Sequence, residues 1–151
     1  MSLNCSHLLS CPCPCPCPCP IWRNFERRSA ERAVWSSITK RLDVYHLALD
    51  FLVFANGVIE ALPRGRSHLA DQFTRASTSI VLNLAEGAGK LSKPDKRRYY
   101  LTARGSATES AALLDVCFRL KLLDAVGHKA GKETLVRVVS MLIKLAQACE
   151  E

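Results

Sequence analysis

Four segments of the chain repeat apolar residues every three or four positions, which is the spacing of one face of an α-helix. The first covers residues 43–61 and ends where Pro63 and Gly65 interrupt the pattern. The second starts at Ser67, its expected cap, the third starts near residue 93, and the fourth covers residues 131–149. Main apolar positions of the first, second and fourth segments are Val44, Leu47, Phe51, Phe54, Val58, Leu62; Leu69, Phe73, Ala76, Ile80, Leu84; Leu135, Val138, Val139, Leu142, Leu145, Ala146.

Residues 83–109 end the second helix and start the third. Gly87 is the expected C-cap of the second helix, because glycine takes a positive φ at little cost. Ser92, followed three residues later by Asp95, is typical of a capping box, and Pro94 falls in the first helical turn, where a missing N–H costs nothing. We therefore expect the third helix to begin at about Lys93.

The third helix carries two adjoining stripes of apolar or small residues. Together they form a wider apolar surface than the core of one bundle can cover. We expect it to span residues 93–123, about 46 Å, so that its basic first turns project past the other helices unless it breaks at Gly105. Short connections leave antiparallel neighbours as the only arrangement, so we predict an all-α, antiparallel up-and-down four-helix bundle that assembles into a homo-oligomer. The stripes are Tyr100, Ala103, Ala107, Ala111, Leu114, Phe118 and Tyr99, Thr102, Ser106, Leu113, Val116, Leu120.

Charge is concentrated at the start of that third helix. The 151 residues carry a formal net charge of +7, and residues 90–104 alone hold six basic residues against one acidic residue, Asp95. Such a local cluster favours an anionic partner, because Lys and Arg neutralise phosphates and an exposed tyrosine can stack on a base. The alternative is a solvated helix start whose tyrosines pack inward. The predicted nucleic-acid-binding residues are Lys90, Lys93, Lys96, Arg97, Arg98, Tyr99 and Arg104.

Several motifs resemble one known family. Residues 83–90 read Asn-Leu-Ala-Glu-Gly-Ala-Gly-Lys, and Ser-x-x-Asp-x-x-Arg-Tyr-Tyr and Ala-x-Gly-Ser-x-x-Glu follow, ending at Glu109. Upstream, residues 42–48, 62–63 and 72–77 also resemble motifs of that family. Over residues 40–149 the chain resembles the four-helix bundle proteins encoded by intervening sequences in 23S ribosomal RNA genes. The resemblance implies an oligomeric bundle, RNA rather than DNA as partner, and, as an alternative, an accessory subunit of a retroelement reverse transcriptase.

Residues 1–40 form a different segment from the bundle domain, residues 41–151. Five of the eight cysteines alternate with proline over residues 11–19, a pattern that excludes helix and central strand and that we interpret as disordered low complexity. Metal binding by these thiols and translated repetitive DNA are the alternatives. Residues 21–38 are a basic arm for nucleic acid or a membrane surface, or a poorly ordered extension. Cys117 fits a free core thiol, and a reducing cytoplasm is the expected setting.

The usual catalytic and metal motifs are missing from the sequence. A di-iron bundle needs two Glu-x-x-His motifs, and the nearest pattern is a single Asp43-x-x-His46. Residues 87–90 lack the first glycine and the hydroxyl residue of a phosphate loop. His46, His68 and His128 have no partner at catalytic or metal spacing. We therefore predict no enzymatic activity, no metal and no cofactor, a protein without a membrane segment, and a protein-interaction module as the second functional class.

Two polar residues fall on stripes expected to be buried. Asn83 follows Ile80 by three positions, and Glu109 lies between Ser106 and Leu113 on the third helix. Because an unpaired buried polar group costs on the order of 1–3 kcal/mol, each needs a partner. We expect a structural polar core of Asn83, Glu109 and Arg75, with Arg98 and Arg104 as alternative partners of Glu109.

Overall fold

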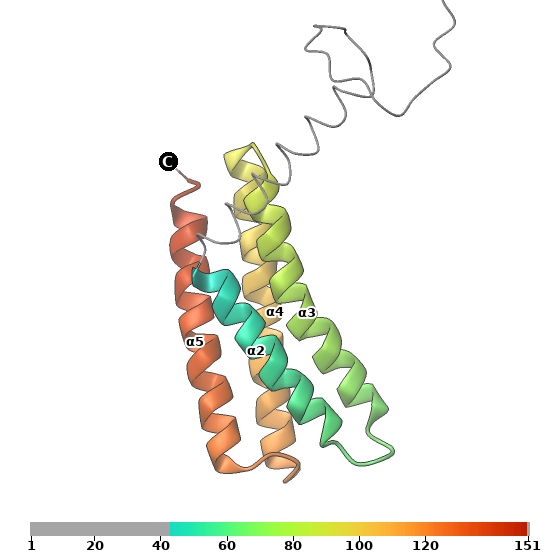
Figure 1. Cartoon of the computed structure of the whole chain (residues 1–151). Helices are drawn as coiled ribbons and strands as arrows, with labels where there is room; N and C mark the ends of the chain where they lie inside the picture. The colour runs from blue at the N-terminus through green and yellow to red at the C-terminus, as the bar shows by residue number, and fades with distance from the viewer. Residues whose placement is uncertain (1–42, 151) are drawn as a thin grey trace, which may run out of the picture. The chain divides into compact units, whose positions relative to one another are not determined.

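The structure is a computed structural model, and it describes residues 43–150. The predicted extension, residues 1–40, lies outside these residues. The described part of the chain forms four helices, α2 (Asp43–Glu60), α3 (Ser67–Gly89), α4 (Lys93–Arg119) and α5 (Ala125–Gln147), and contains no strand (Figure 1).

The four helices form an antiparallel up-and-down bundle, as predicted. Each helix packs against the next one in the chain, and α5 returns to pack against α2, so that every helix has two neighbours (Figure 1). Connections at residues 61–66, 90–92 and 120–124 are too short for any other direction of the following helix. The α2–α3 and α4–α5 connections therefore lie at one end of the bundle, and the α3–α4 connection lies at the other.

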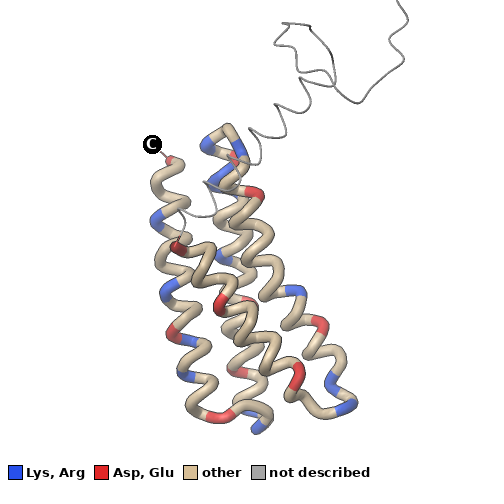
Figure 2. The backbone as a smooth tube through the Cα atoms, in the orientation of Figure 1, with Lys and Arg blue, Asp and Glu red and all other residues tan. Residues whose placement is uncertain are grey.

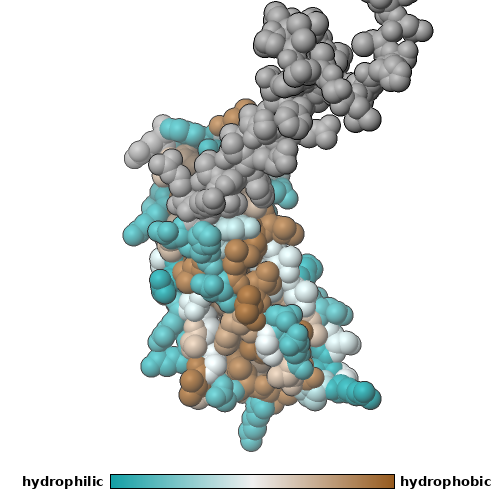
Figure 3. Space-filling model, in the orientation of Figure 1, coloured by the Kyte–Doolittle hydropathy of each residue, from teal (hydrophilic) through white to brown (hydrophobic). Residues whose placement is uncertain are grey.

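Large apolar side chains from all four helices meet in the centre. Removing each of them from water contributes roughly 1.5–3 kcal/mol, which makes this core the main source of stability. Hydrophobic residues also run along the face that carries α2, where Val53 is 74% exposed (Figure 3). The largest side chains with less than 2% exposure are Phe51, Phe73, Ile80, Leu84, Leu114, Leu135, Leu142, Val44 and Val138.

The end of α3 differs from the prediction at Gly87. The helix continues to Gly89, and Gly87 is a buried helical residue instead of a C-cap with positive φ. A Cβ atom at Gly87 would lie 2.8 Å from Cε1 of Tyr100 and 3.0 Å from Cβ of Tyr99. The glycine is therefore required by the close approach of α4 to α3, because no side chain fits between them.

The observed helix starts agree with the predicted ones at Ser92 but not at the other two positions. Ser92 caps α4 as predicted, its hydroxyl accepting a hydrogen bond from the backbone N–H of Asp95 at 3.3 Å. Ser67 is the first residue of α3 and not its cap, which is Arg66. The last helix begins at Ala125, not near residue 131, because Asp124 caps it by accepting from the N–H of Gly127 at 2.9 Å.

α4 is shorter than predicted. It ends at Arg119, where Lys121 takes a left-handed φ of 57° and the N–H of Leu122 bonds to the carbonyl of Cys117 at 2.8 Å. This is the hydrogen bond of a Schellman motif, which stops a helix. At 27 residues against 23 for α3 and α5, α4 is longer by about one turn, so the predicted projection beyond the bundle is small.

The first predicted stripe of α4 faces the core from Tyr100 to Leu114 but not at Phe118, which is 38% exposed. The second stripe is buried at Ser106 and partly at Leu113, whereas Val116 is 40% exposed and Leu120 is 43% exposed. The second stripe therefore leaves apolar surface uncovered along the end of α4.

Candidate functional site

The predicted basic residues gather at one end of the bundle. Lys90 belongs to the α3–α4 connection, and the others lie on the first turns of α4, with Arg104 farther along the helix. Figure 2 shows Lys and Arg clustered at the tip of the α3–α4 hairpin. The cap at Ser92 and the proline at position 94 fix where α4 begins, and thereby fix the direction of these side chains. We call Lys90, Lys93, Lys96, Arg97, Arg98 and Arg104 the basic patch.

Most of the basic patch has no acidic partner among the described residues. The exception is Arg97, whose Nε donates to Oε1 of Glu150 at 2.8 Å. This pair joins the start of α4 to the residues that follow α5, and its side chains are 42% and 52% exposed. Because an exposed ion pair contributes only about 0–1 kcal/mol, a phosphate can replace Glu150 at little cost. The five other basic residues are not in ion pairs with the described acidic residues.

Tyr99 and Tyr100, which follow Arg98 on α4, are not free stacking surfaces. Nζ of Lys90 lies 4.9 Å from the centre of the Tyr99 ring, and Cζ of Arg98 lies 5.3 Å from it. These cation–π contacts place two cations over the Tyr99 ring, which the sequence analysis predicted to stack on a base. Tyr100 is 5% exposed, and burial raises the pKa of its hydroxyl. The geometry of this patch thus favours contacts between cations and phosphates over base stacking.

The predicted polar core is only partly buried. Nδ2 of Asn83 donates to the carbonyl of Ser79 at 2.8 Å and to its hydroxyl at 3.0 Å, and the Ser79 and Ser106 hydroxyls lie 2.8 Å apart. These hydrogen bonds satisfy half-buried groups between α3 and α4. The expected burial of Glu109 is wrong, whereas its expected pairing with Arg75 is present.

Glu109 and Arg75 form an ion pair on the surface. Nη2 of Arg75 lies 2.9 Å from Oε1 of Glu109, but their side chains are 68% and 44% exposed, in that order. The pair links α3 to α4, and Arg75 also donates to Gln72 at 2.6 Å. Glu109 is exposed because it lies at the edge of the second predicted stripe of α4, and no other described helix covers that edge.

A second group of interacting polar side chains lies near the α4–α5 connection and was not anticipated. Nε2 of His128 lies 2.7 Å from Oδ1 of Asp115, and Nζ of Lys132 donates to Oδ2 of the same carboxylate at 2.8 Å. These hydrogen bonds, that from Lys132 first, lower the pKa of Asp115. His128 also stacks on Phe118, with ring centres 4.5 Å apart and planes 19° apart.

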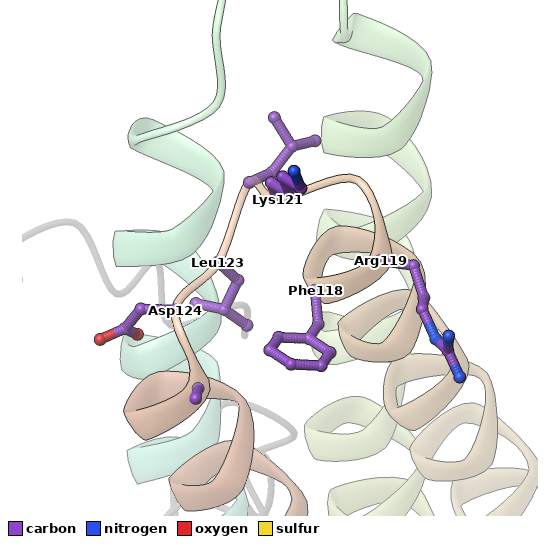
Figure 4. A pocket seen from close by; sticks show the side chains of 7 residues that line it. Phe118, Arg119, Lys121, Leu123 and Asp124 are labelled. Carbon is purple, nitrogen blue, oxygen red and sulfur yellow. The ribbon is translucent and has the colours of Figure 1, made fainter.

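A hollow of about 550 Å³ opens beside Phe118, beneath the α4–α5 connection (Figure 4). Phe118 and Leu123 lie next to one another in it, Lys121 lies at the top of the turn, and Arg119 projects from the far side of Phe118 (Figure 4). The α2–α3 connection brings Arg64 and Arg66 to the same end of the bundle. Counting charges along the sequence did not predict a basic surface at this end, because Arg64 and Arg66 are far from Arg119 and Lys121 in the sequence.

The described residues contain no group of three or more His, Cys, Asp or Glu side chains that could hold a metal ion. Cys117 is a free, buried thiol, and burial raises its pKa, which makes it a poor nucleophile. Among the described helices, none combines the length and apolar character needed to cross a membrane.

A family model described as 23S rRNA-intervening sequence protein matches residues 40–144. The chain belongs to this family. The match covers all of α2, α3 and α4 and most of α5, so the basic patch and the α4–α5 turn both lie inside the family region. It confirms the resemblance inferred from the motifs between residues 42 and 109.

A solved structure supports the same fold. The chain is similar to a protein with unknown function from the S23 ribosomal protein family of Bacteroides thetaiotaomicron, with a TM-score of 0.64 and 20% sequence identity. The match covers 68% of this chain and 97% of the other. At this identity the similarity shows the fold alone. A search of curated proteins found no match.

Proposed function

We propose that this member of the 23S rRNA-intervening sequence protein family binds nucleic acid, with RNA preferred, through the basic patch and without catalysing a reaction. The observation that carries the proposal is the accumulation of six basic residues against one acidic residue in residues 90–104, at one end of the bundle. Five of the six are free of ion pairs within residues 43–150. The preference for RNA rests on the description of the family.

Local stability does not explain this charge. The N-terminus of a helix carries the positive end of the macrodipole, so Lys93, Lys96 and Arg97 in the first turns of α4 disfavour the helix slightly. Ser92 and Asp95 already supply the favourable interactions at this end. Phosphates bound among these cations offset their unfavourable interaction with the helix macrodipole. Their binding also releases the counterions of the nucleic acid, which is the usual driving force for binding.

We also propose that the bundle is a homo-oligomer. Apolar side chains remain exposed on the outer surfaces of α4 and α5 and at the C-cap of α4: Val116 is 40% exposed, the C-cap Leu120 43%, Val136 64% and Ile143 37%. Their burial against a second copy supplies a driving force for assembly. Several copies present several basic patches to one nucleic acid, which raises the affinity without any new contact.

A protein-interaction module is the second candidate, and a groove between α2 and α3 favours it. The groove has a volume of about 370 Å³, and its lining includes Leu52, Val53 and Ile59. A partner helix can place an apolar face in such a groove. Binding of that kind responds little to salt, whereas binding to phosphates weakens steeply as salt increases.

The deciding experiment removes three charges from the patch. In the variant Lys93→Gln, Lys96→Gln, Arg97→Gln, each lost phosphate contact should reduce the magnitude of the slope of log affinity against log salt by about 0.7–0.9. The matched control, Lys129→Gln, Arg137→Gln, Lys144→Gln, removes the same charge from exposed positions of α5 and should retain the slope.

Salt titrations against structured RNA, single-stranded RNA and duplex DNA measure both slopes, and circular dichroism checks the fold. Glu150→Gln supplies a test in the opposite direction, because it removes the competitor of the phosphates for Arg97 and should raise the affinity up to about fivefold. Equal slopes for the patch variant and its control would reject the basic patch. Salt-independent binding of a protein partner would then favour the second candidate.

A further inference from the structure

Phe118 carries an exposed aromatic surface at the end of the bundle opposite to the basic patch. The residue is 38% exposed, one side of its ring is stacked on His128, and it also lines the hollow beneath the α4–α5 connection. Leu123 lies beside it and extends the apolar surface (Figure 4). Flat apolar surfaces of this kind are where planar heterocycles stack.

Neighbouring residues hold this surface in place. His128 is fixed from its other edge by Asp115 at 2.7 Å, and Lys132 holds that carboxylate at 2.8 Å. Two helices therefore contribute to one connected arrangement, with Phe118 and Asp115 from α4 and His128 and Lys132 from α5. Because the Phe118 ring already has a stacking partner, it loses little conformational freedom when a ligand binds.

The rim of the hollow is cationic. Arg119 and Lys121 lie on it and have no ion pair with described residues. The acidic residue of the rim, Asp124, accepts the hydrogen bond of the Gly127 N–H at 2.9 Å, and its carboxylate points away from Phe118 (Figure 4). Lys121 keeps a left-handed φ of 57°, a conformation that favours glycine, so this lysine is present at a conformational cost.

We propose that this hollow is a second nucleic-acid site, which stacks one unpaired base on Phe118 and Leu123 and places the adjacent phosphate against Lys121 and Arg119. Aromatic stacking combined with a positively charged groove is the usual mode for single-stranded nucleic acid. At about 550 Å³ the hollow is large enough for a base, and it is open, so a chain can enter and leave it.

This inference extends the proposed function and assigns base contact to Phe118 instead of Tyr99, whose ring lies beside Lys90 and Arg98. Unpaired nucleotides are the preferred form of the ligand, because the bases of a continuous duplex are already stacked on one another. Arg64 and Arg66, at the same end of the bundle, are placed to contact phosphates farther along the strand.

The test uses the full chain and two short probes, a hexauridine RNA and an abasic backbone of the same length. Phe118→Leu keeps an apolar side chain but removes the ring, and it should weaken binding of the hexauridine about five- to hundredfold without changing binding of the abasic probe. Lys121→Gln should weaken the binding of both probes and reduce the magnitude of the slope of log affinity against log salt by about 0.7. Val126→Ala is the control, since Val126 is 76% exposed near the same turn but does not line the hollow.

Spectroscopy supplies a second measurement that does not depend on a variant. Uridine monophosphate should shift the NMR signals of the Phe118 and His128 rings, and ribose phosphate should not. Unchanged hexauridine binding in folded Phe118→Leu, or unshifted ring signals, would overturn the inference, while a loss of binding in the patch variant would leave the proposed function standing. The reverse result, loss in Phe118→Leu with an unaffected patch variant, would reject the patch and retain this site. Absence of any RNA binding by the unaltered protein would overturn both.

Discussion

Two glycines in the bundle allow the closeness of its helix packing to be measured. Gly105 lies on an exposed surface of α4, and an added Cβ atom would have no atom within 4 Å apart from its chain neighbours and the nearby backbone of α4 itself. Gly131 is buried on α5, and a Cβ there would lie 2.7 Å from Cε1 of Phe54 and 2.8 Å from Cδ1 of Leu114. Alanine at the two positions therefore adds the same methyl group to opposite environments.

The magnitudes follow from two effects. Replacing a helical glycine by alanine stabilises a helix by about 0.5–1 kcal/mol, and this gain is common to both sites. At Gly131 the neighbours must move by roughly 1 Å to reach an ordinary carbon–carbon contact of about 3.5–4.0 Å, and such overpacking costs about 1–3 kcal/mol. We expect Gly105→Ala to be more stable than the unaltered protein by about 0.5–1 kcal/mol, and Gly131→Ala to be less stable than Gly105→Ala by about 1–3 kcal/mol.

Urea denaturation followed by circular dichroism measures both differences, and equal m-values show that the variants unfold from similar states. The measurements are repeated at several protein concentrations, because a second copy packed against Gly105 would turn its gain into a concentration-dependent loss. Equal stabilities of the two variants would refute the close approach of α5 to α2 and α4 at this level of the bundle.

Two further predictions concern the α4–α5 turn. Lys121→Gly should raise the free energy of unfolding by about 1 kcal/mol, measured by urea denaturation, because glycine takes the left-handed φ of 57° without strain; an unchanged or lower value would contradict that account. The pKa of Asp115 is lowered in the folded protein. Its ion pairs therefore stabilise the fold at any pH above the unfolded-state pKa of about 3.9, and this stabilisation is lost as the pH falls through the lower pKa of the folded state. Asp115→Asn should therefore lower the free energy of unfolding by up to about 1 kcal/mol at neutral pH, since the side chain is 50% exposed. Thermal unfolding from pH 7 to pH 2 should show the stabilities of the variant and the unaltered protein converging in acid, and a difference that stays constant would contradict the argument.

Apolar periodicity was enough to predict the four helices, because each helix buries an apolar stripe, and the short connections between them were enough to predict their antiparallel order. Helix ends were less predictable, since a glycine has two possible uses. Gly87 suggested a helix end because glycine tolerates positive φ, yet the structure uses it for the approach of Tyr100. That role depends on a residue of the neighbouring helix and leaves no local signal.

The candidate sites differ in the same way. Residues 90–104 carry their charge in one continuous segment, so counting along the sequence was sufficient to find the basic patch. The partner of Arg97, by contrast, is Glu150, 53 residues away, and His128 meets Asp115 across the α4–α5 turn. A search for histidines with partners at the spacing of known motifs cannot detect such a pair, because the turn and not the spacing brings the two residues together.

The length of α4 sets the distance between the two ends of the bundle. Its 27 residues span about 40 Å. If both ends hold nucleic acid, this length sets a minimum size for the ligand: a molecule shorter than about 40 Å reaches only one end, and a longer one that leaves a nucleotide unpaired at the α4–α5 turn can occupy both ends of a single bundle. The dependence of affinity on the length of the nucleic acid should then contain a step whose position is fixed by the number of turns in one helix.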